Sequence, residues 1–265
     1  MTSPAPDDDK WIRRFHRSED SSIALVCFPH AGGSASNYFA MSQSLAPNIE
    51  VLAVQYPGRQ DRRHEPFIDN MSVLADRIFE ALSPLSGYPF AFFGHSMGAI
   101  LSFEVAHRFS QETSAGPRWL FASGRRAPSR YRISNVHLRD DAGLVAELRK
   151  AGGTQARVLD DPELRAMILP AVRNDYRAIE QYAYLPRPPL SCPITVLVGD
   201  SDPQTSLDEA VAWREHSTGD FDIHIFPGGH FYLEAYQAEV NDAVLAALYD
   251  VPTIVSCANG AGRAI

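Results

Sequence analysis

The chain has 265 residues and carries 24 Lys and Arg against 32 Asp and Glu, a formal net charge of −8. This length suits one large domain or two small ones, and 45% hydrophobic with 21% charged residues excludes wholesale disorder. The acidic balance argues against a nucleic-acid partner, the three cysteines match neither a disulfide framework nor a zinc site, and no segment reaches the ~18 apolar residues of a membrane span.

Short apolar runs recur along the chain and predict β-strands. In order they are Ile23–Phe28, Val51–Val54, Phe90–Phe93, Trp119–Ser123, Ile194–Val198 and Asp222–Phe226. Most are continuously hydrophobic rather than alternating, which is typical of strands buried on both faces of a parallel sheet. Segments with helical periodicity lie between or after them, at Met71–Leu82, Ala99–Phe109, Leu207–His216 and Tyr232–Tyr249. This alternation predicts an α/β protein with a mostly parallel, doubly wound sheet.

One interval, from about residue 125 to 187, contains helical patterns and no good strand. A helix is predicted over Ala142–Lys150, and a longer one starts with Asp161 as N-cap and Pro162 in its first turn. Pro170 predicts a break or kink in that second helix. An insertion at this point would sit above the carboxyl ends of the strands, where ligands bind in such sheets. We interpret residues 126–187, the lid segment, as a helical lid; an unusually long crossover helix is the alternative.

The clearest chemical motif is Gly94-His95-Ser96-Met97-Gly98, which lies between a predicted strand and a predicted helix. A sharp strand-turn-helix junction needs small residues at both glycine positions, because the backbone approaches itself there. Such a turn raises the serine hydroxyl to the edge of the sheet at the positive end of a helix. We therefore predict that Ser96 is a nucleophile, with a structural serine in a tight turn as the alternative.

A serine nucleophile needs a base to take its proton and an acid to orient that base. In this topology the order is Ser, Asp or Glu, then His, each after a later strand. The last predicted strand is followed by Pro-Gly-Gly-His230, so His230 is the predicted base. The strand before it is followed by Gly199-Asp200-Ser201-Asp202-Pro203. Asp202 lies further into the loop and is the favoured acid, whereas Asp200 is suited to bracing the turn.

The predicted oxyanion hole combines two backbone N–H groups. Met97, directly after the nucleophile, supplies one, and the loop after the strand Ile23–Phe28 supplies the other. Ala31 is the candidate in that loop, because Gly32 and Gly33 allow close approach of the backbone. His30, beside it, is either a substrate contact or a hydrogen-bonded structural residue.

Six motifs together resemble the type II thioesterases, the free-standing α/β-hydrolases that serve polyketide and nonribosomal peptide synthases. The motifs, in family order, are Phe28-Pro-His-Ala-Gly-Gly33, Gln55-Tyr-Pro-Gly-Arg59, Phe93-Gly-His-Ser-Met-Gly98, Ser123-Gly-Arg-Arg-Ala-Pro128, Gly199-Asp-Ser-Asp-Pro203 and Gly229-His-Phe231. The resemblance covers about residues 23–248. It implies a single α/β-hydrolase domain over residues 1–265 with a helical lid, and it places the acid at Asp202. Flexible ends are expected at about residues 1–20 and 251–265.

The resemblance also implies the substrate, an acyl group held as a thioester on the phosphopantetheine arm of an acyl or peptidyl carrier domain. The expected chemistry needs no metal or other cofactor. Carrier domains are typically acidic, so docking would need a local basic patch. Arg125, Arg126, Arg130 and Arg132 are candidates for contacting the phosphate or the carrier; a solvated face, or ion pairs with Asp140 and Asp141, is the alternative.

The expected protein is a cytoplasmic monomer with no nucleic-acid or membrane partner, since its first residues, MTSPAPDDDK, lack the features of a signal peptide. Other functions fit the same triad. A carboxylesterase or lipase would prefer oxygen esters, and a medium-chain thioesterase of a fatty acid synthase would differ in chain-length preference. A carrier-binding protein with a vestigial site is a third alternative, against which the three intact triad residues argue.

Overall fold

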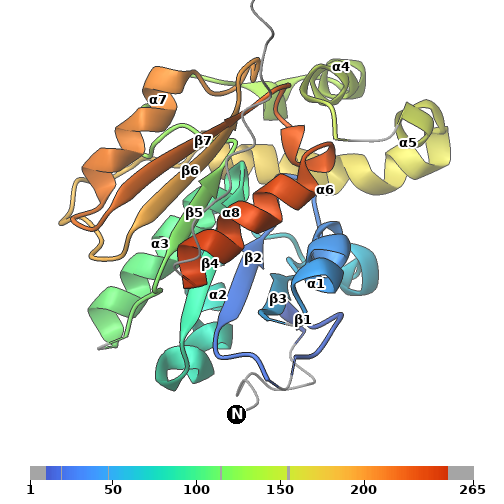
Figure 1. Cartoon of the computed structure of the whole chain (residues 1–265). Coiled ribbons are helices and arrows are strands. Elements are labelled where there is room, and N and C mark those ends of the chain that lie inside the picture. The colour runs from blue at the N-terminus through green and yellow to red at the C-terminus, as the bar shows by residue number, and fades with distance from the viewer. Residues whose placement is uncertain (1–9, 19, 47, 114, 154–155, 250–265) are drawn as a thin grey trace, which may run out of the picture.

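The computed structural model describes residues 10–249, with the exception of 19, 47, 114 and 154–155. Its centre is a seven-stranded sheet with the order β1-β3-β2-β4-β5-β6-β7 (Figure 1). The strands are β1 (Ile12–Arg13), β2 (Ala24–Phe28), β3 (Glu50–Val54), β4 (Phe90–His95), β5 (Leu120–Ser123), β6 (Ile194–Gly199) and β7 (Phe221–Phe226). Every neighbouring pair is parallel except β1 and β3, so the predicted doubly wound α/β fold is confirmed.

The six predicted strands form within one or two residues of their expected bounds. Strands β2 to β6 are buried along their whole length, which explains their continuous hydrophobicity, whereas β7 lies at an edge and is partly exposed. The short strand β1 was not predicted. It lies inside the expected flexible start of the chain, yet Ile12 is buried and pairs with Val54. Of the expected flexible residues, 1–9, 19 and 251–265 lie outside the described part of the chain.

Helices cover both faces of the sheet (Figure 1). Helices α2 (Met71–Leu82) and α3 (Met97–Glu112) pack on one face, and α1 (Phe39–Leu45) and α8 (Gln237–Tyr249) pack on the other. Helix α2 has its predicted bounds, since Met71, Leu74, Ala75, Ile78 and Leu82 form its buried stripe. The predicted helix Leu207–His216 divides into α7 (Leu207–Val211) and the 3-10 helix η5 (Ala212–His216). The predicted helix Tyr232–Tyr249 also divides, into the 3-10 helix η6 (Tyr232–Glu234) and, after a short break, helix α8.

Between β5 and β6 the chain forms helices and no named strand. They are the 3-10 helix η4 (Val136–Leu138), α4 (Asp141–Ala151), α5 (Ala156–Asp160) and α6 (Pro162–Glu180). Asp161 caps α6 as predicted, since its carboxylate accepts hydrogen bonds from the N–H groups of Glu163 and Leu164. The predicted break at Pro170 does not occur, since α6 is continuous through that residue. A proline removes only one backbone N–H donor, and the packing around the helix tolerates the loss of that hydrogen bond.

The lid segment has its own small core, which explains how it holds together away from the sheet. Val136, Leu144, Leu148, Leu159, Leu169 and Val172 pack as one buried cluster. Figure 1 shows α4, α5 and α6 grouped beyond the carboxyl ends of the strands. The loops after β2, β4, β6 and β7 open toward the same side, which is where a parallel sheet binds its ligands. None of the described helices is long and apolar enough to cross a membrane.

Candidate active site

Ser96 lies on the predicted turn between β4 and α3. Its backbone has φ +56° and ψ −116°, a conformation that a residue with a side chain rarely adopts. Both flanking glycines are required, because a Cβ on Gly94 would lie 2.2 Å from the carbonyl oxygen of Gly98, and a Cβ on Gly98 would lie 2.0 Å from that of Phe28. This strained turn exposes the Ser96 hydroxyl to a pocket at the edge of the sheet.

The two residues predicted to supply the oxyanion hole line the same pocket. Met97 is the first residue of α3, so its N–H has no partner within the helix. Ala31 follows β2, and its N–H, like that of Met97, donates no hydrogen bond to any described residue. Both residues line the pocket together with Ser96. The structure therefore brings the two predicted oxyanion donors to the predicted nucleophile.

His230 and Asp202 form a buried pair. The Nδ1–H of His230 donates to Oδ2 of Asp202 at 2.8 Å, and the two side chains are 3% and 0% exposed. With Nδ1 engaged by the carboxylate, Nε2 is the ring nitrogen left to contact other groups. The other oxygen of Asp202 accepts from the N–H of Gln204. Asp200 instead accepts from the Ser201 hydroxyl and the Gly228 N–H, which braces the turn as its alternative role predicted.

His230 and Ser96 line one pocket, although no hydrogen bond joins the Ser96 hydroxyl to the ring in the described chain. Such bonds are often long until substrate binds. Two further imidazoles lie close. Burial, and then His230, lowers the pKa of His95 well below its ordinary value and that of His30 to about 4. Both are thus neutral at pH 7, so they add no fixed positive charge beside the His230–Asp202 pair.

His95 and His30 are held in different ways. His95 Nδ1 lies 2.8 Å from the Ser123 hydroxyl, which in turn lies 2.6 Å from that of Tyr232. The His30 ring makes no side-chain hydrogen bond to the described residues and packs edge-on against Phe231, with 4.8 Å between ring centroids. The hydrogen-bonded structural role is therefore filled by His95 rather than by His30, which borders the pocket.

The pocket at Ser96 is small, and the lid segment supplies part of its wall. Its volume is about 40 Å³, and α4 and α6 contribute Leu148, Ala151, Tyr176 and Ile179 to its walls. A larger pocket of about 200 Å³ adjoins it and shares Arg125, Tyr176, Ile179 and Gln204. The two pockets therefore share part of their walls.

The four arginines at the start of the lid segment line one pocket, the larger one, but they differ in exposure and in their partners. Arg125 lines both pockets, its buried Nε has no hydrogen-bond partner, and burial, then Arg126, lowers its pKa to about 9. Arg126 donates to the carbonyl of Gln204. Arg130 pairs with Glu215 and Arg132 with Glu209.

The ion pairs with Asp140 and Asp141 that formed the alternative for these arginines are absent from the described residues. Asp140 instead caps α4, where it accepts from the Gly143 N–H, and Asp141 pairs with Arg173. No group of three His, Cys, Asp or Glu side chains in the described chain could hold a metal ion.

Tyr176 and Gln204, which line both pockets, were not predicted as site residues. Gln204 follows Asp202 by two residues, so its loop position was a usable signal. Tyr176 lies on α6, and only the folding of the lid segment over the sheet brings it to the site.

Comparisons with known proteins give this geometry its context. The model of the thioesterase domain family matches residues 24–248. The chain is 52% identical over 240 residues to the probable cadicidin biosynthesis thioesterase of Streptomyces griseus, covering 91% of this chain and 66% of that protein. It is 46% identical to thioesterase PikA5 of Streptomyces venezuelae, over 88% and 84% of the two chains.

A solved structure of a thioesterase is also similar to this chain. The type II thioesterase BorB from the borrelidin biosynthetic cluster superposes with a TM-score of 0.86 at 46% identity, covering 92% of this chain and 99% of that one. The chain spans just under two-thirds of the length of the first of these relatives and most of the other two. The family match covers most of the residues that build the sheet, the turn at Ser96 and the loops around the pocket. The chain belongs to the thioesterase domain family and is a thioester hydrolase with an α/β-hydrolase fold.

Proposed function

We propose that the chain hydrolyses acyl groups from the phosphopantetheine arm of acyl or peptidyl carrier domains, as an editing type II thioesterase of polyketide or nonribosomal peptide biosynthesis. The relatives' names support this pathway context, since they refer to thioesterases of biosynthetic clusters. The observation that carries the chemistry is the buried Asp202–His230 pair beside the pocket of Ser96. It supplies an oriented base to a serine on a strained turn.

In the proposed first half-reaction, the Ser96 Oγ attacks the thioester carbonyl carbon while Nε2 of His230 takes the hydroxyl proton. The carboxylate of Asp202 keeps the ring oriented and stabilises the imidazolium that forms. The tetrahedral oxyanion accepts hydrogen bonds from the N–H groups of Ala31 and Met97, which have no other described partner. Collapse breaks the carbon–sulfur bond, and His230 returns the proton to the thiolate of the pantetheine arm.

In the second half-reaction, a water molecule enters and His230 removes one of its protons as the oxygen attacks the acyl-serine. The same two N–H groups stabilise the second oxyanion, and the proton then passes to Ser96 as the acid leaves. Each proton and bond is balanced by groups of the chain and one water, so the proposal uses no metal or other cofactor. A thioester is more easily attacked than an amide, which suits slow editing of stalled acyl groups.

We also propose roles for the remaining predicted binding residues. The Arg125 guanidinium borders both pockets without a described partner and is suited to binding an oxygen of the acyl or pantetheine chain. His30 is a candidate contact for the substrate near the thioester, since its ring lines the same pocket. Arg126, which is partly exposed and adjacent, is a candidate for the phosphate or the carrier surface. We expect the enzyme to act as a cytoplasmic monomer.

The test is intact-protein mass spectrometry of acyl-loaded carrier proteins incubated with the wild type and with Ser96→Ala. The panel runs from acetyl and propionyl to octanoyl and an aminoacyl group, with matched oxygen esters in parallel. We expect the wild type alone to release the acyl groups, with thioesters preferred over oxygen esters. Intact acyl-carriers in both tubes, with oxygen esters consumed, would favour an esterase instead.

A further inference from the structure

The structure joins the lid segment to the oxyanion loop through one buried carboxylate. We propose that Asp175 of α6, together with Arg59, is a positioning residue that holds the loop Pro29–Gly33 so that the Ala31 N–H faces the reacting carbonyl. The proposal rests on the proposed function, since this N–H matters only where an oxyanion forms at Ser96. It gives the lid segment a part in catalysis besides covering the pocket.

The contacts of Asp175 are short, numerous and buried. Its Oδ2 accepts from the Gly32 N–H at 2.8 Å and from Arg59 Nη1 at 2.6 Å, and its Oδ1 accepts from Arg59 Nη2 at 2.9 Å. The side chains of Asp175 and Arg59 are 2% and 8% exposed. A two-pronged pair of this kind fixes distance and orientation together. The carboxylate is thus held at one position relative to the Gly32 peptide.

Gly32 is the residue of the loop that Asp175 contacts. Its φ is +78°, and a Cβ there would lie 2.5 Å from Cγ2 of Val172, so α6 packs directly on the loop. The Gly33 N–H bonds back to the His30 carbonyl, which closes a tight turn around Ala31. With the Gly32 N–H directed at Asp175, the plane of the Ala31–Gly32 peptide is fixed. The Ala31 N–H belongs to the preceding peptide, whose carbonyl, that of His30, accepts from Gly33, and this N–H is left without a described partner in the pocket of Ser96.

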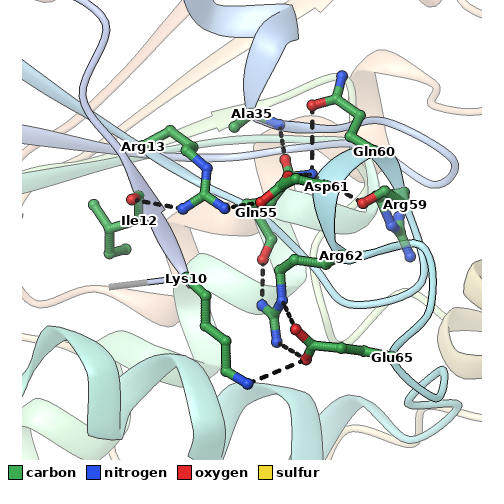
Figure 2. A network of polar contacts seen from close by, with 10 residues as sticks. All are labelled: Lys10, Ile12, Arg13, Ala35, Gln55, Arg59, Gln60, Asp61, Arg62 and Glu65. Atoms are coloured by element: carbon green, nitrogen blue, oxygen red, sulfur yellow. Dashed lines mark hydrogen bonds and ion pairs between the residues drawn. The ribbon is translucent and has the colours of Figure 1, made fainter. Parts of the chain in front are cut away.

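Arg59 is anchored on its other side by the network of Figure 2. Gln55 accepts from the Ala35 N–H at 2.8 Å and donates to the Arg59 carbonyl at 3.3 Å, while Arg62 donates to the Gln55 carbonyl at 2.6 Å (Figure 2). Arg59 Nη1 also donates to the Gly33 carbonyl at 3.1 Å. The guanidinium therefore holds the Gly33 carbonyl directly and the neighbouring Gly32 N–H through Asp175.

Electrostatics indicates that this pair serves geometry more than stability. Burial alone lowers the pKa of Arg59, but the carboxylate of Asp175 raises it above its ordinary value, so the guanidinium stays charged. Charges removed from water are costly, and apolar replacements of a buried pair are often as stable or more so. What an apolar pair cannot replace is the directed acceptor for the Gly32 N–H. The pair is thus suited to fixing the loop.

The test uses three variants: Asp175→Ala, the apolar double variant Arg59→Met/Asp175→Leu, and the control Arg173→Ala. Arg173 lies on the same helix but bonds only within the lid segment, to Asp141 and the carbonyls of His137 and Arg139. Readouts are kcat and KM on an acyl-carrier, the rate of labelling by a serine-directed phosphonate, and the thermal midpoint. The double variant is included because Asp175→Ala leaves a buried arginine unpaired and can fail to fold.

We expect the double variant to keep a thermal midpoint close to that of the wild type while kcat falls by about 10–100-fold and KM changes by less than about threefold. Phosphonate labelling should slow in parallel, because it also builds negative charge at the oxyanion site. Arg173→Ala should keep kcat within about twofold. Unchanged kcat and labelling in a folded double variant, or an equal loss of kcat in Arg173→Ala, would overturn the proposal.

The two readouts separate this inference from the proposed function. If the wild type releases no acyl group from any carrier, the proposed function fails, while the labelling rates still report on the position of the oxyanion donors. If the wild type is active and both rates survive loss of Asp175, only the positioning role fails.

Discussion

The two aspartates of one loop illustrate how position decides chemistry at the scale of single residues. Asp202 and Asp200 are two residues apart, yet the first contacts the ring of His230 and the second the Gly228 N–H. A carboxylate that orients the base contributes to every turnover, whereas one that braces a turn contributes to loop stability alone. The loop thus provides its own matched control.

We predict that Asp202→Asn lowers kcat by roughly 10³–10⁴-fold, because an amide favours the wrong tautomer of His230. Asp200→Asn should change kcat by less than about threefold, since it keeps an oxygen that can accept from Gly228. Steady-state hydrolysis of one acyl-carrier by both variants checks this. Equal losses of kcat in the two variants would show that the assignment of Asp202 as the acid is wrong.

At the scale of elements, the junction of β4 and α3 determines where Ser96, the proposed nucleophile, lies. Gly98 approaches the carbonyl of Phe28, the last residue of β2, so the helix start and the neighbouring strand are packed without room for a side chain. We predict that Gly98→Ala costs about 3 kcal/mol in the free energy of unfolding, through the backbone shift that the added methyl forces. Gly87→Ala, where a Cβ meets nothing within 4 Å, is the control and should cost less than about 1 kcal/mol.

Urea unfolding at pH 7 gives both values. A small loss for Gly98→Ala, equal to that of Gly87→Ala, would show that the junction has slack that the structure does not indicate.

We expect the lid segment to move so that a substrate can enter. The contacts differ along the lid segment. The second half of α6 is bonded through Asp175 to the loop after β2, whereas α4 and α5 contact mainly the small core of the lid segment. We therefore predict that amides of α4 and α5 exchange hydrogen faster than those of residues 172–180. Exchange mass spectrometry of the unliganded protein measures this, and uniform protection across α4, α5 and α6 would contradict it.

At the scale of the whole molecule, several buried histidines favour stability near neutral pH. Burial lowers the pKa values of His107 and His216 to about 4, with Arg187 adding to the effect at His107, and the site histidines shift the same way. The folded state favours the neutral forms of these histidines, whereas the unfolded state takes up protons below the ordinary pKa of about 6.5. Their contribution to the free energy of unfolding is therefore complete above pH 6.5 and is lost as pH falls toward 4.

We predict that the wild type loses stability steeply between pH 6.5 and 4, and that His107→Leu removes about 1 kcal/mol of the loss between pH 7 and 5. Unfolding midpoints in urea at the two pH values test this. The exposed His64 provides the control, since His64→Gln should leave the slope unchanged. An equal slope in His107→Leu and the wild type would refute the prediction.

Much of this architecture was predictable because the signals are local. Continuous apolar runs identify strands buried on both faces, and the glycines around Ser96 announce a crowded turn. Short elements such as β1 and α5 were missed, because two to five residues carry too little periodicity and form only against a neighbour. The pair Arg59–Asp175 was beyond prediction for a related reason: 116 positions separate the partners, and only the packed lid segment brings them together.

The most direct test of the central claim, that Ser96 is a nucleophile activated by His230, is labelling by a serine-directed phosphonate followed by intact mass and peptide mapping. We predict one adduct per chain on the peptide that contains Ser96, none in Ser96→Ala, and labelling slowed by roughly 10²-fold or more in His230→Gln. An adduct that forms at the wild-type rate in Ser96→Ala, or on another residue of the wild type, would contradict it.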